Sequence, residues 1–155
     1  MSAREQAINY FLKGYNCCQA VAAPFALKYG WDFDETMKIC SSFGGGMGRL
    51  REVCGAVSGM FFVIGRVNGY ADPQDYEEKK RHYADVQRLA ALFRAEYGSY
   101  LCRDIVQNAS DGTTPEERTP QFYRKRPCAE YVGFAAECTE KYLNGAFSEW
   151  NGKNN

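Results

Sequence analysis

Residues 53–67, V-C-G-A-V-S-G-M-F-F-V-I-G-R-V, form the most apolar run of the chain. Five small or charged residues interrupt the run: Gly55, Ser58, Gly59, Gly65 and Arg66. A membrane-spanning helix needs roughly 20 predominantly apolar residues. We therefore expect a buried core helix over about residues 51–68. Gly55 and Gly59 share one face of that helix, where a neighbouring helix can approach closely.

Helix signals also dominate the rest of the chain, and no β-strand pattern appears. Capping residues and apolar stripes predict helices over about 2–14, 17–29, 32–43, 72–97, 100–107 and 127–143. Pro24 is expected to kink or shorten the second of them. The predicted fold is an all-α, single-domain helical bundle of about six to seven helices with one long loop at 108–127. The domain is expected to cover residues 1–150, with a frayed tail at 151–155.

Composition limits the function. Lysine plus arginine and aspartate plus glutamate each number 19, and this zero net charge argues against nucleic-acid and anionic-membrane partners. The single histidine, His82, excludes a multi-histidine metal site. Residues 1–13 lack the apolar core of a signal peptide. We expect a cytoplasmic protein without membrane insertion, in which cysteines serve as thiols, metal ligands or redox groups.

Seven cysteines are the unusual feature of the composition. Four of them fall in the first turn of a predicted helix: Cys17, Cys54, Cys102 and Cys128. Helix N-termini stabilise anions, and a thiol there can have its pKa lowered from about 8.5 to between 3.5 and 7.5. These four are therefore the candidate reactive or metal-ligating residues. Cys40 and Cys138 lie within apolar helix faces and are expected to serve core packing.

Topology favours a meeting of these four thiols. Short connections make consecutive helices roughly antiparallel, which brings Cys17, Cys54 and Cys102 to one end of the bundle. The loop at 108–127 is long enough to return Cys128 to that end. No C-x-x-C or C-x-x-C-H motif is present, so a thioredoxin-like motif and c-type haem are not expected.

A glycine run precedes Cys54, and it lacks the spacing of a phosphate-binding loop, so no nucleotide is expected. The candidate cofactor-binding residues are Gly44, Gly45, Gly46 and Gly55. The run either presents backbone N–H groups to a thiolate or cluster sulfide, or forms a tight turn between helices. Gly55 either joins that site or serves helix packing. Three arginines near the thiols either lower their pKa values or are solvated charges: Arg49, Arg51 and Arg103.

The long loop is expected to cover the cysteine end of the bundle. Phe122 and Tyr123 are suited to closing an apolar opening, and residues 124–126 (R-K-R) bring positive charge toward thiolates. We expect this loop to be more mobile when the cysteines are oxidised or empty. The alternative is an ordinary solvated surface loop.

The ordered motifs resemble the C_GCAxxG_C_C family of redox-active proteins. They are residues 14–17 (G-Y-N-C), 43–48 (F-G-G-G-M-G), 52–59 (E-V-C-G-A-V-S-G), 102–103 (C-R) and Cys128. The resemblance implies an all-helical domain from a prokaryote, frequent association with a transporter system, and redox-active or cluster-binding roles for Cys17, Cys54, Cys102 and Cys128. Cys18 departs from the family pattern and is an alternative to Cys17 as the functional thiol. Cys40 and Cys138 are additional.

Three functions remain open. The first is a redox protein, with oxidoreductase as its candidate enzyme class. Its four cysteines would perform thiol–disulfide or electron-transfer chemistry with a redox partner protein or a small-molecule thiol or electron donor. The second is a protein that binds an iron–sulfur cluster, or another metal such as zinc, on the same four cysteines. The third is a helical interaction module with incidental thiols. Anaerobic metal content and reversible disulfide formation separate the three.

Overall fold

The computed structural model describes residues 1–106, 112 and 114–147, and it confirms the all-α fold. The only β-type pairing in these residues is an isolated antiparallel bridge between Val53 and Leu101. The predicted tail at 151–155 lies outside them. The helices are α1 (Ala3–Leu12), α2 (Cys17–Tyr29), α3 (Phe33–Cys40), a 3-10 turn (Ser41–Phe43), α4 (Gly44–Met47), α5 (Gly55–Asn68), α6 (Tyr76–Tyr97), α7 (Cys102–Ile105), α8 (Pro120–Lys125) and α9 (Cys128–Leu143).

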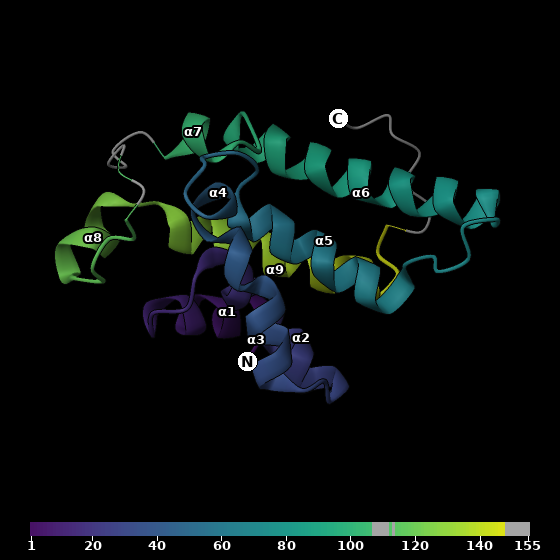
Figure 1. The fold of residues 1–155 in the computed structure, drawn as a ribbon, viewed down its shortest axis with the longest axis horizontal. Coiled ribbons are helices and arrows are strands. Elements are labelled where there is room, and N and C mark those ends of the chain that lie inside the picture. The colour runs from purple at the N-terminus through teal and green to yellow at the C-terminus, as the bar shows by residue number, and fades with distance from the viewer. Residues whose placement is uncertain (107–111, 113, 148–155) are drawn as a thin grey trace.

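The core lies where α2, α5 and α9 meet, with α1 packed on α2 and α9 (Figure 1). The α5 side chains of Val57, Met60, Val63 and Ile64 are fully buried, as expected for a core helix. No helix in the described residues has the length and apolar character needed to cross a bilayer. In Figure 1, α4, α7 and α8 gather at the left end of the bundle, where α5 and α9 begin.

Close approach of α2 and α5 depends on the predicted glycine face. A Cβ atom added to Gly59 would lie 2.9 Å from the carbonyl oxygen of Cys18 and 2.9 Å from Cβ of Val21. Ordinary Cβ contacts are longer than this, so a side chain at Gly59 would push the two helices apart. The expectation that these glycines serve helix packing is correct for this residue.

We predict that Gly59→Ala lowers the free energy of unfolding by about 1–3 kcal/mol, because overpacking forces the backbones of α2 and α5 to shift. The matched control is Gly65→Ala on the same helix, where the nearest atom to an added Cβ is 3.8 Å away. Alanine favours helix formation, so this control should be neutral or stabilising by up to about 1 kcal/mol. Urea denaturation of both variants measures the difference, and equal stability would contradict the packing role.

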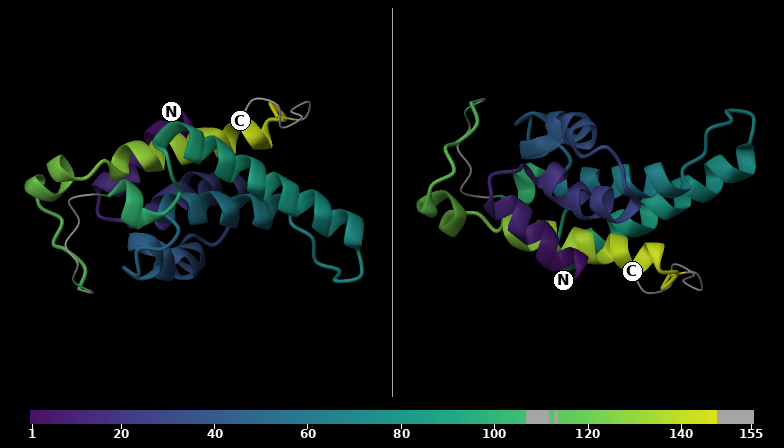
Figure 2. Two further views of the ribbon diagram at one scale, coloured as in Figure 1. Left: turned by 90° about the horizontal axis from the view of Figure 1, so that it is seen from above. Right: turned by 90° about the horizontal axis from the view of Figure 1, so that it is seen from below.

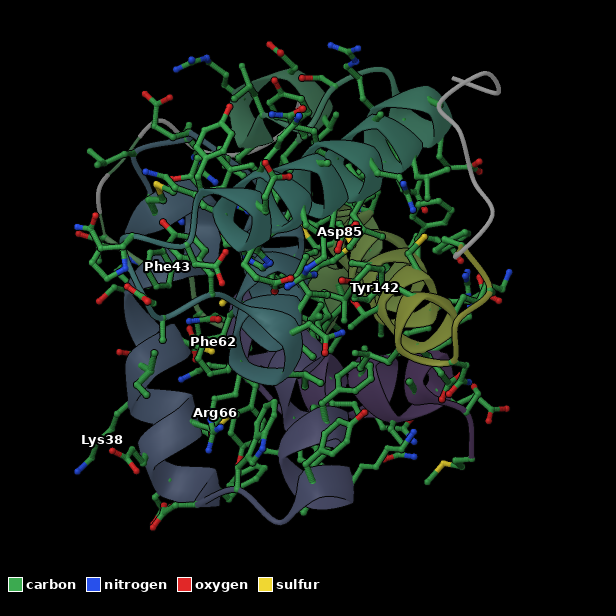
Figure 3. All side chains as sticks on the ribbon, turned by 90° about the vertical axis from the view of Figure 1, so that its right-hand side faces the viewer. Lys38, Phe43, Phe62, Arg66, Asp85 and Tyr142 are labelled. Atoms are coloured by element: carbon green, nitrogen blue, oxygen red, sulfur yellow. The ribbon has the colours of Figure 1, made fainter. Side chains whose placement is uncertain are left out.

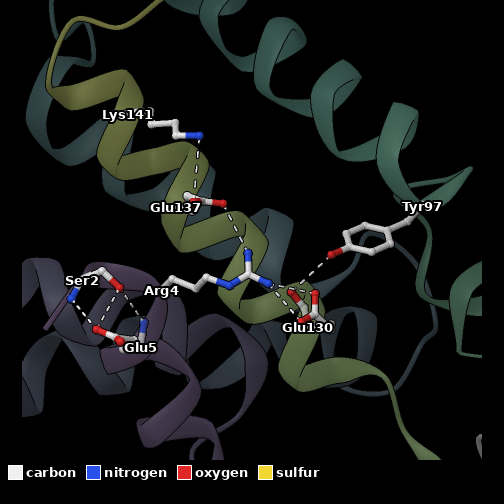
Figure 4. Close-up of polar contacts among 7 residues, drawn as sticks. All are labelled: Ser2, Arg4, Glu5, Tyr97, Glu130, Glu137 and Lys141. Atoms are coloured by element: carbon white, nitrogen blue, oxygen red, sulfur yellow. Dashed lines mark hydrogen bonds and ion pairs between the residues drawn. The ribbon is translucent and has the colours of Figure 1, made fainter.

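Polar contacts fix the first turns of α9 against α1 (Figure 4). Arg4 of α1 donates to Glu130 at 2.9 Å and to Glu137 at 3.3 Å, so one guanidinium clamps two turns of α9. On the other side of α9, the hydroxyl of Tyr142 donates to Asp85 of α6 at 2.5 Å (Figure 3). The contact of Arg4 with Glu130 lies in the first turn of α9, which begins at Cys128.

Three predicted helix starts were placed too early. Helix α5 begins at Gly55 instead of about residue 51, because the preceding residues form the bridge to Leu101. Helix α6 begins at Tyr76 with Asp75 as its N-cap, beyond the predicted start at residue 72. The helix expected over 100–107 is reduced to α7, four residues long.

Two further predictions about helices need correction. Helix α2 is not shortened at Pro24 and continues to Tyr29, whereas a kink at Pro24 stays a prediction. The predicted loop at 108–127 contains α8, which Thr119 caps by accepting from the amide of Phe122. Pro120 occupies the first turn of α8, where a proline costs no hydrogen bond.

The connection between α5 and α6 is exposed and projects from the bundle (Figure 2). Residues 71–80, which include the start of α6, are all exposed. Figure 2 shows this hairpin extending beyond the other helices on the side opposite α8. The α5–α6 connection therefore projects from the end of the bundle opposite the four helix starts (Figure 2).

Candidate functional site

The structure places all four candidate cysteines at helix starts. Cys17, Cys102 and Cys128 are the first residues of α2, α7 and α9, and Cys54 is the N-cap of α5. All four line one cavity of about 230 Å³. Cys54, Cys102 and Cys128 are buried, whereas Cys17 is partly exposed. The bundle therefore brings together thiols that are up to 111 residues apart in sequence, Cys17 to Cys128.

Backbone pairing holds Cys54 beside Cys102. The amide of Cys54 donates to the carbonyl of Tyr100 at 2.9 Å, and the amide of Cys102 donates to the carbonyl of Glu52 at 2.7 Å. These two bonds flank the bridge between Val53 and Leu101. The extended stretch before α5 therefore holds the starts of α5 and α7 side by side through backbone hydrogen bonds.

Gly55 brings the start of α5 against the start of α2. A Cβ on Gly55 would lie 3.0 Å from Cβ of Cys17 and 2.8 Å from the carbonyl oxygen of Phe43. No larger side chain fits there without moving Cys17 or the 3-10 turn. Gly55 thus lines the cavity and serves helix packing at the same time.

The glycine run forms a left-handed turn. Residues 45–49 all have positive φ values, between 61° and 71°, although Met47 and Arg49 carry side chains. A left-handed conformation costs a non-glycine residue about 1–2 kcal/mol. The turn is closed by bonds such as the amide of Glu52 donating to the carbonyl of Gly46 at 2.9 Å. The interpretation of the run as a tight turn is therefore correct, and the turn lines the cavity through Gly44, Gly45, Gly46 and Gly48.

Cys17 and Cys128 form a thiol pair with unequal acidity. The Cys17 thiol donates a hydrogen bond to Cys128, which lowers the pKa of Cys128 to about 7. The positive charges of Arg126 and Arg118 add to this effect. The same hydrogen bond, together with burial, raises the pKa of Cys17. Cys128 is therefore the more acidic thiol of the pair.

The expectation that every helix start lowers a thiol pKa is wrong for Cys54 and Cys17. Burial raises the pKa of Cys54 to about 12, and the amides of Ala56 and Val57 at the start of α5 only partly offset it. Removing a thiolate from water costs more free energy than the helix dipole returns. Cys128 differs because it accepts a hydrogen bond from Cys17 and because Arg126 and Arg118 lie close to it.

The remaining three cysteines lie away from this cavity. The Cys18 thiol donates to Cys40, which raises the pKa of Cys18 and lowers that of Cys40. Burial raises the pKa of Cys138 to about 11. Cys40 is therefore a hydrogen-bonded partner of Cys18 in addition to a packing residue.

The arginines expected near the thiols have three different environments. Arg51 donates to the sulfur of Cys102 at 3.6 Å. Arg49 lines the cavity and donates to the carbonyl of Gly112 at 2.9 Å. Arg103 instead pairs with Glu52 at 3.2 Å on the exposed surface, so it is the solvated charge of the three.

The segment before α9 covers the cavity as far as the structure describes it. Phe122 is buried in the cavity wall, and the hydroxyl of Tyr123 donates to the carbonyls of Phe11 and Leu12 at 3.3 Å each. The Arg126 side chain is 7% exposed and lines the cavity, whereas Arg124 faces solvent. The side chain of Lys125 lies outside the described part. Redox-dependent mobility of this segment stays a prediction.

Sequence reasoning missed Arg118, Glu116 and Phe11 as residues of the cavity. Arg118 follows Glu116 and Glu117, a pattern that normally indicates a solvated surface. Phe11 belongs to the apolar stripe of α1 and is indistinguishable from other core residues in sequence. Only the tertiary fold brings α1 and residues 115–118 to the thiols.

Labelling with iodoacetamide across pH tests the acidity of Cys128. Because the thiolate is the reacting species, the rate at Cys128 should rise with pH and reach half of its maximum near pH 7. Cys138, on the same helix and similarly buried, should need a pH near 11. Peptide mass spectrometry gives both rates from one sample. A shared pH midpoint for the two residues would contradict the role of Arg118 and Arg126.

The four cysteines of the cavity could serve as metal ligands. Within the described residues, no three histidine, cysteine, aspartate or glutamate side chains are arranged to hold a single metal ion. Four cysteine sulfurs are the ligand set of an iron–sulfur cluster and also of a tetrahedral zinc site.

The comparisons with known proteins agree with the site. The family described as "Putative redox-active protein (C_GCAxxG_C_C)" matches residues 15–142. The match includes all four cavity cysteines, the glycine run and both basic residues beside Cys128. No curated protein and no solved structure matches the chain.

Proposed function

The chain belongs to the C_GCAxxG_C_C family of redox-active proteins, and on that premise we propose that Cys17 and Cys128 cycle between a dithiol and a disulfide. The observation that carries this proposal is the thiol pair itself, in which Cys17 is hydrogen-bonded to a Cys128 whose pKa is about 7. A nucleophilic thiolate beside a protonated thiol is the arrangement that thiol–disulfide exchange needs. In class, this makes the protein an oxidoreductase.

The exchange proceeds in two steps. The Cys128 thiolate attacks one sulfur of a substrate disulfide, forms a mixed disulfide and releases the first substrate thiolate. Cys17 then gives its proton to that thiolate and attacks the Cys128 sulfur, which releases the second substrate thiolate. Two electrons pass from the protein to the substrate, and the reverse sequence reduces the protein again.

Cys54 and Cys102 supply two further thiols on the same cavity. Cys54, with a pKa of about 12, is protonated at neutral pH and is a weaker nucleophile than Cys128. We place this second pair as a later acceptor of oxidation, which reacts after Cys17 and Cys128 do.

The proposal is tested by equilibrating the protein anaerobically with mixtures of reduced and oxidised dithiothreitol and counting thiols after denaturation. We expect two thiols to disappear in one reversible two-electron transition. Cys138→Ser, which removes a thiol away from the cavity, should show the same transition. Constant thiol content over the whole potential range would overturn the proposal.

An iron–sulfur cluster on the same four cysteines is the second candidate, favoured by the convergence of four sulfur donors on one cavity. When bound, such a group supplies one-electron transfer. Anaerobic purification followed by iron and acid-labile sulfide analysis decides between the candidates. Stoichiometric iron lost in the Cys102→Ser variant would support the cluster. Colourless, iron-free protein that still forms its disulfide would support the thiol cycle. Protein that contains no iron and forms no disulfide would fit only the interaction module.

The thiol cycle requires a partner that accepts and returns two electrons. A redox partner protein or a small-molecule thiol and its disulfide meets this requirement, and a reducing cytoplasm supplies both. Association with a transporter system, implied by the family resemblance, is part of the proposal and is tested by co-purification from the native cell.

A further inference from the structure

The cavity carries more positive charge than its own acidic group offsets. Arg49, Arg118 and Arg126 line it, and Glu116 is the one carboxylate among the described lining residues. Glu116 forms ion pairs with Arg126 and, at 3.9 Å, with Arg49. A thiolate on Cys128 would offset one more charge. The three arginines and these two anions together leave a net charge of +1 among the described lining residues.

Arg118 has a hydrogen-bond donor that finds no acceptor among the described residues. Its guanidinium lies 4.7 Å from the ring centres of both Phe11 and Phe122, which hold it in a fixed plane. Nη2 donates to the carbonyl of Tyr15 at 3.3 Å. Nη1 is buried and has no hydrogen-bond partner among the described residues. Leaving a buried charged donor unsatisfied is costly, so a ligand that accepts from Nη1 stabilises this arrangement.

We propose that the cavity binds a small oxyanion, of the carboxylate, sulfate or phosphate type, between Arg118 and Arg126 and beside Cys128. Planar guanidinium groups match the paired oxygens of such anions. A cavity of about 230 Å³ is large enough for a ligand of this size, since a cavity of about 150 Å³ accepts benzene. The inference extends the proposed function, because it identifies the anionic group by which a substrate would be held at the reactive thiol.

Two sources share this chemistry: a free inorganic oxyanion, and the carboxylate of a small thiol or disulfide. Sulfate and phosphate represent the first, and acetate represents the second. Each is titrated into the fully reduced protein under anaerobic conditions at constant ionic strength, by calorimetry. Tight binding of the inorganic anions alone assigns the first source, and preference for acetate assigns the second.

Arg118→Gln should weaken binding of the preferred anion by about tenfold or more, because a hydrogen bond between charged partners contributes about 1.5–3 kcal/mol. Arg118→Lys keeps the charge without the fork and should show a smaller loss. The control is Arg124→Gln, which removes an exposed arginine from the neighbouring helix α8 and should leave the dissociation constant unchanged.

A second readout keeps the test independent of variant folding. A bound oxyanion should slow iodoacetamide labelling of Cys128 in the wild-type protein and leave labelling of Cys138 unchanged. The inference is overturned if none of the three anions binds or protects Cys128, or if folded Arg118→Gln binds as the wild type does. Binding of sulfate involves no oxidation of the thiols. The anion titration can therefore fail while disulfide formation succeeds, and the reverse is also true.

Discussion

Replacing Cys128 with serine is expected to abolish the reversible two-electron oxidation of the protein at neutral pH. Cys128 is the cavity thiol whose pKa is held near 7 by Cys17, Arg126 and Arg118, so its removal takes away the proposed attacking thiolate. Cys17→Ser should also abolish the disulfide but leave Cys128 available for a stable mixed disulfide with the oxidant. Thiol counting and intact mass measure both outcomes.

The matched control is Cys138→Ser, which lies on the same helix, is similarly buried and faces away from the cavity. It should retain the oxidation of the wild type. Cys18→Ser distinguishes the two neighbouring thiols, since Cys18 is hydrogen-bonded to Cys40 and not to Cys128. Loss of the reversible oxidation in Cys18→Ser, with Cys17→Ser unaffected, would contradict the assignment.

The second large effect is expected at Gly46. Its φ value is +71°, and an added Cβ would lie 2.6 Å from Cβ of Cys102 and 2.8 Å from Cα of Arg51. Left-handed strain and overpacking act together, so Gly46→Ala should lower the free energy of unfolding by about 2–5 kcal/mol. The substitution should also displace Cys102 from the cavity and change its labelling rate.

Gly30→Ala separates the two causes. Gly30 has nearly the same φ value, +68°, but no atom lies within 4 Å of an added Cβ. This control should lose only the stability that left-handed strain costs, about 1–2 kcal/mol. Urea denaturation of the reduced proteins measures both variants. Equal losses in the two would show that the left-handed turn does not press against Cys102.

The sequence was sufficient to predict that the four candidate cysteines lie at or beside helix starts, and for α2 it gave the starting residue itself. Asn16 and Gln19 form the capping box that makes Cys17 the first residue of α2, and this signal is local. The glycines at 55 and 59 predicted a close approach of helices, and the structure shows α2 at that distance. Local rules worked here because backbone capping and the absence of side chains act within a few residues.

Other parts of the site depend on tertiary contacts that no local pattern contains. The pKa of Cys54 is set by burial, which sequence position at a helix start does not reveal. Arg118 enters the cavity because Phe11 and Phe122, more than 100 residues apart, enclose its guanidinium. The left-handed turn at 45–49 was hidden for a different reason, since Met47 and Arg49 rarely adopt positive φ.

The most direct test of the account is to identify the first disulfide that forms. The reduced protein is treated anaerobically with less than one equivalent of a disulfide oxidant, quenched with acid, alkylated and digested under conditions that prevent exchange. Peptide mass spectrometry should find Cys17 linked to Cys128 before any other pair. A first disulfide between Cys18 and Cys40, or one that leaves Cys128 alkylated, would contradict the central claim.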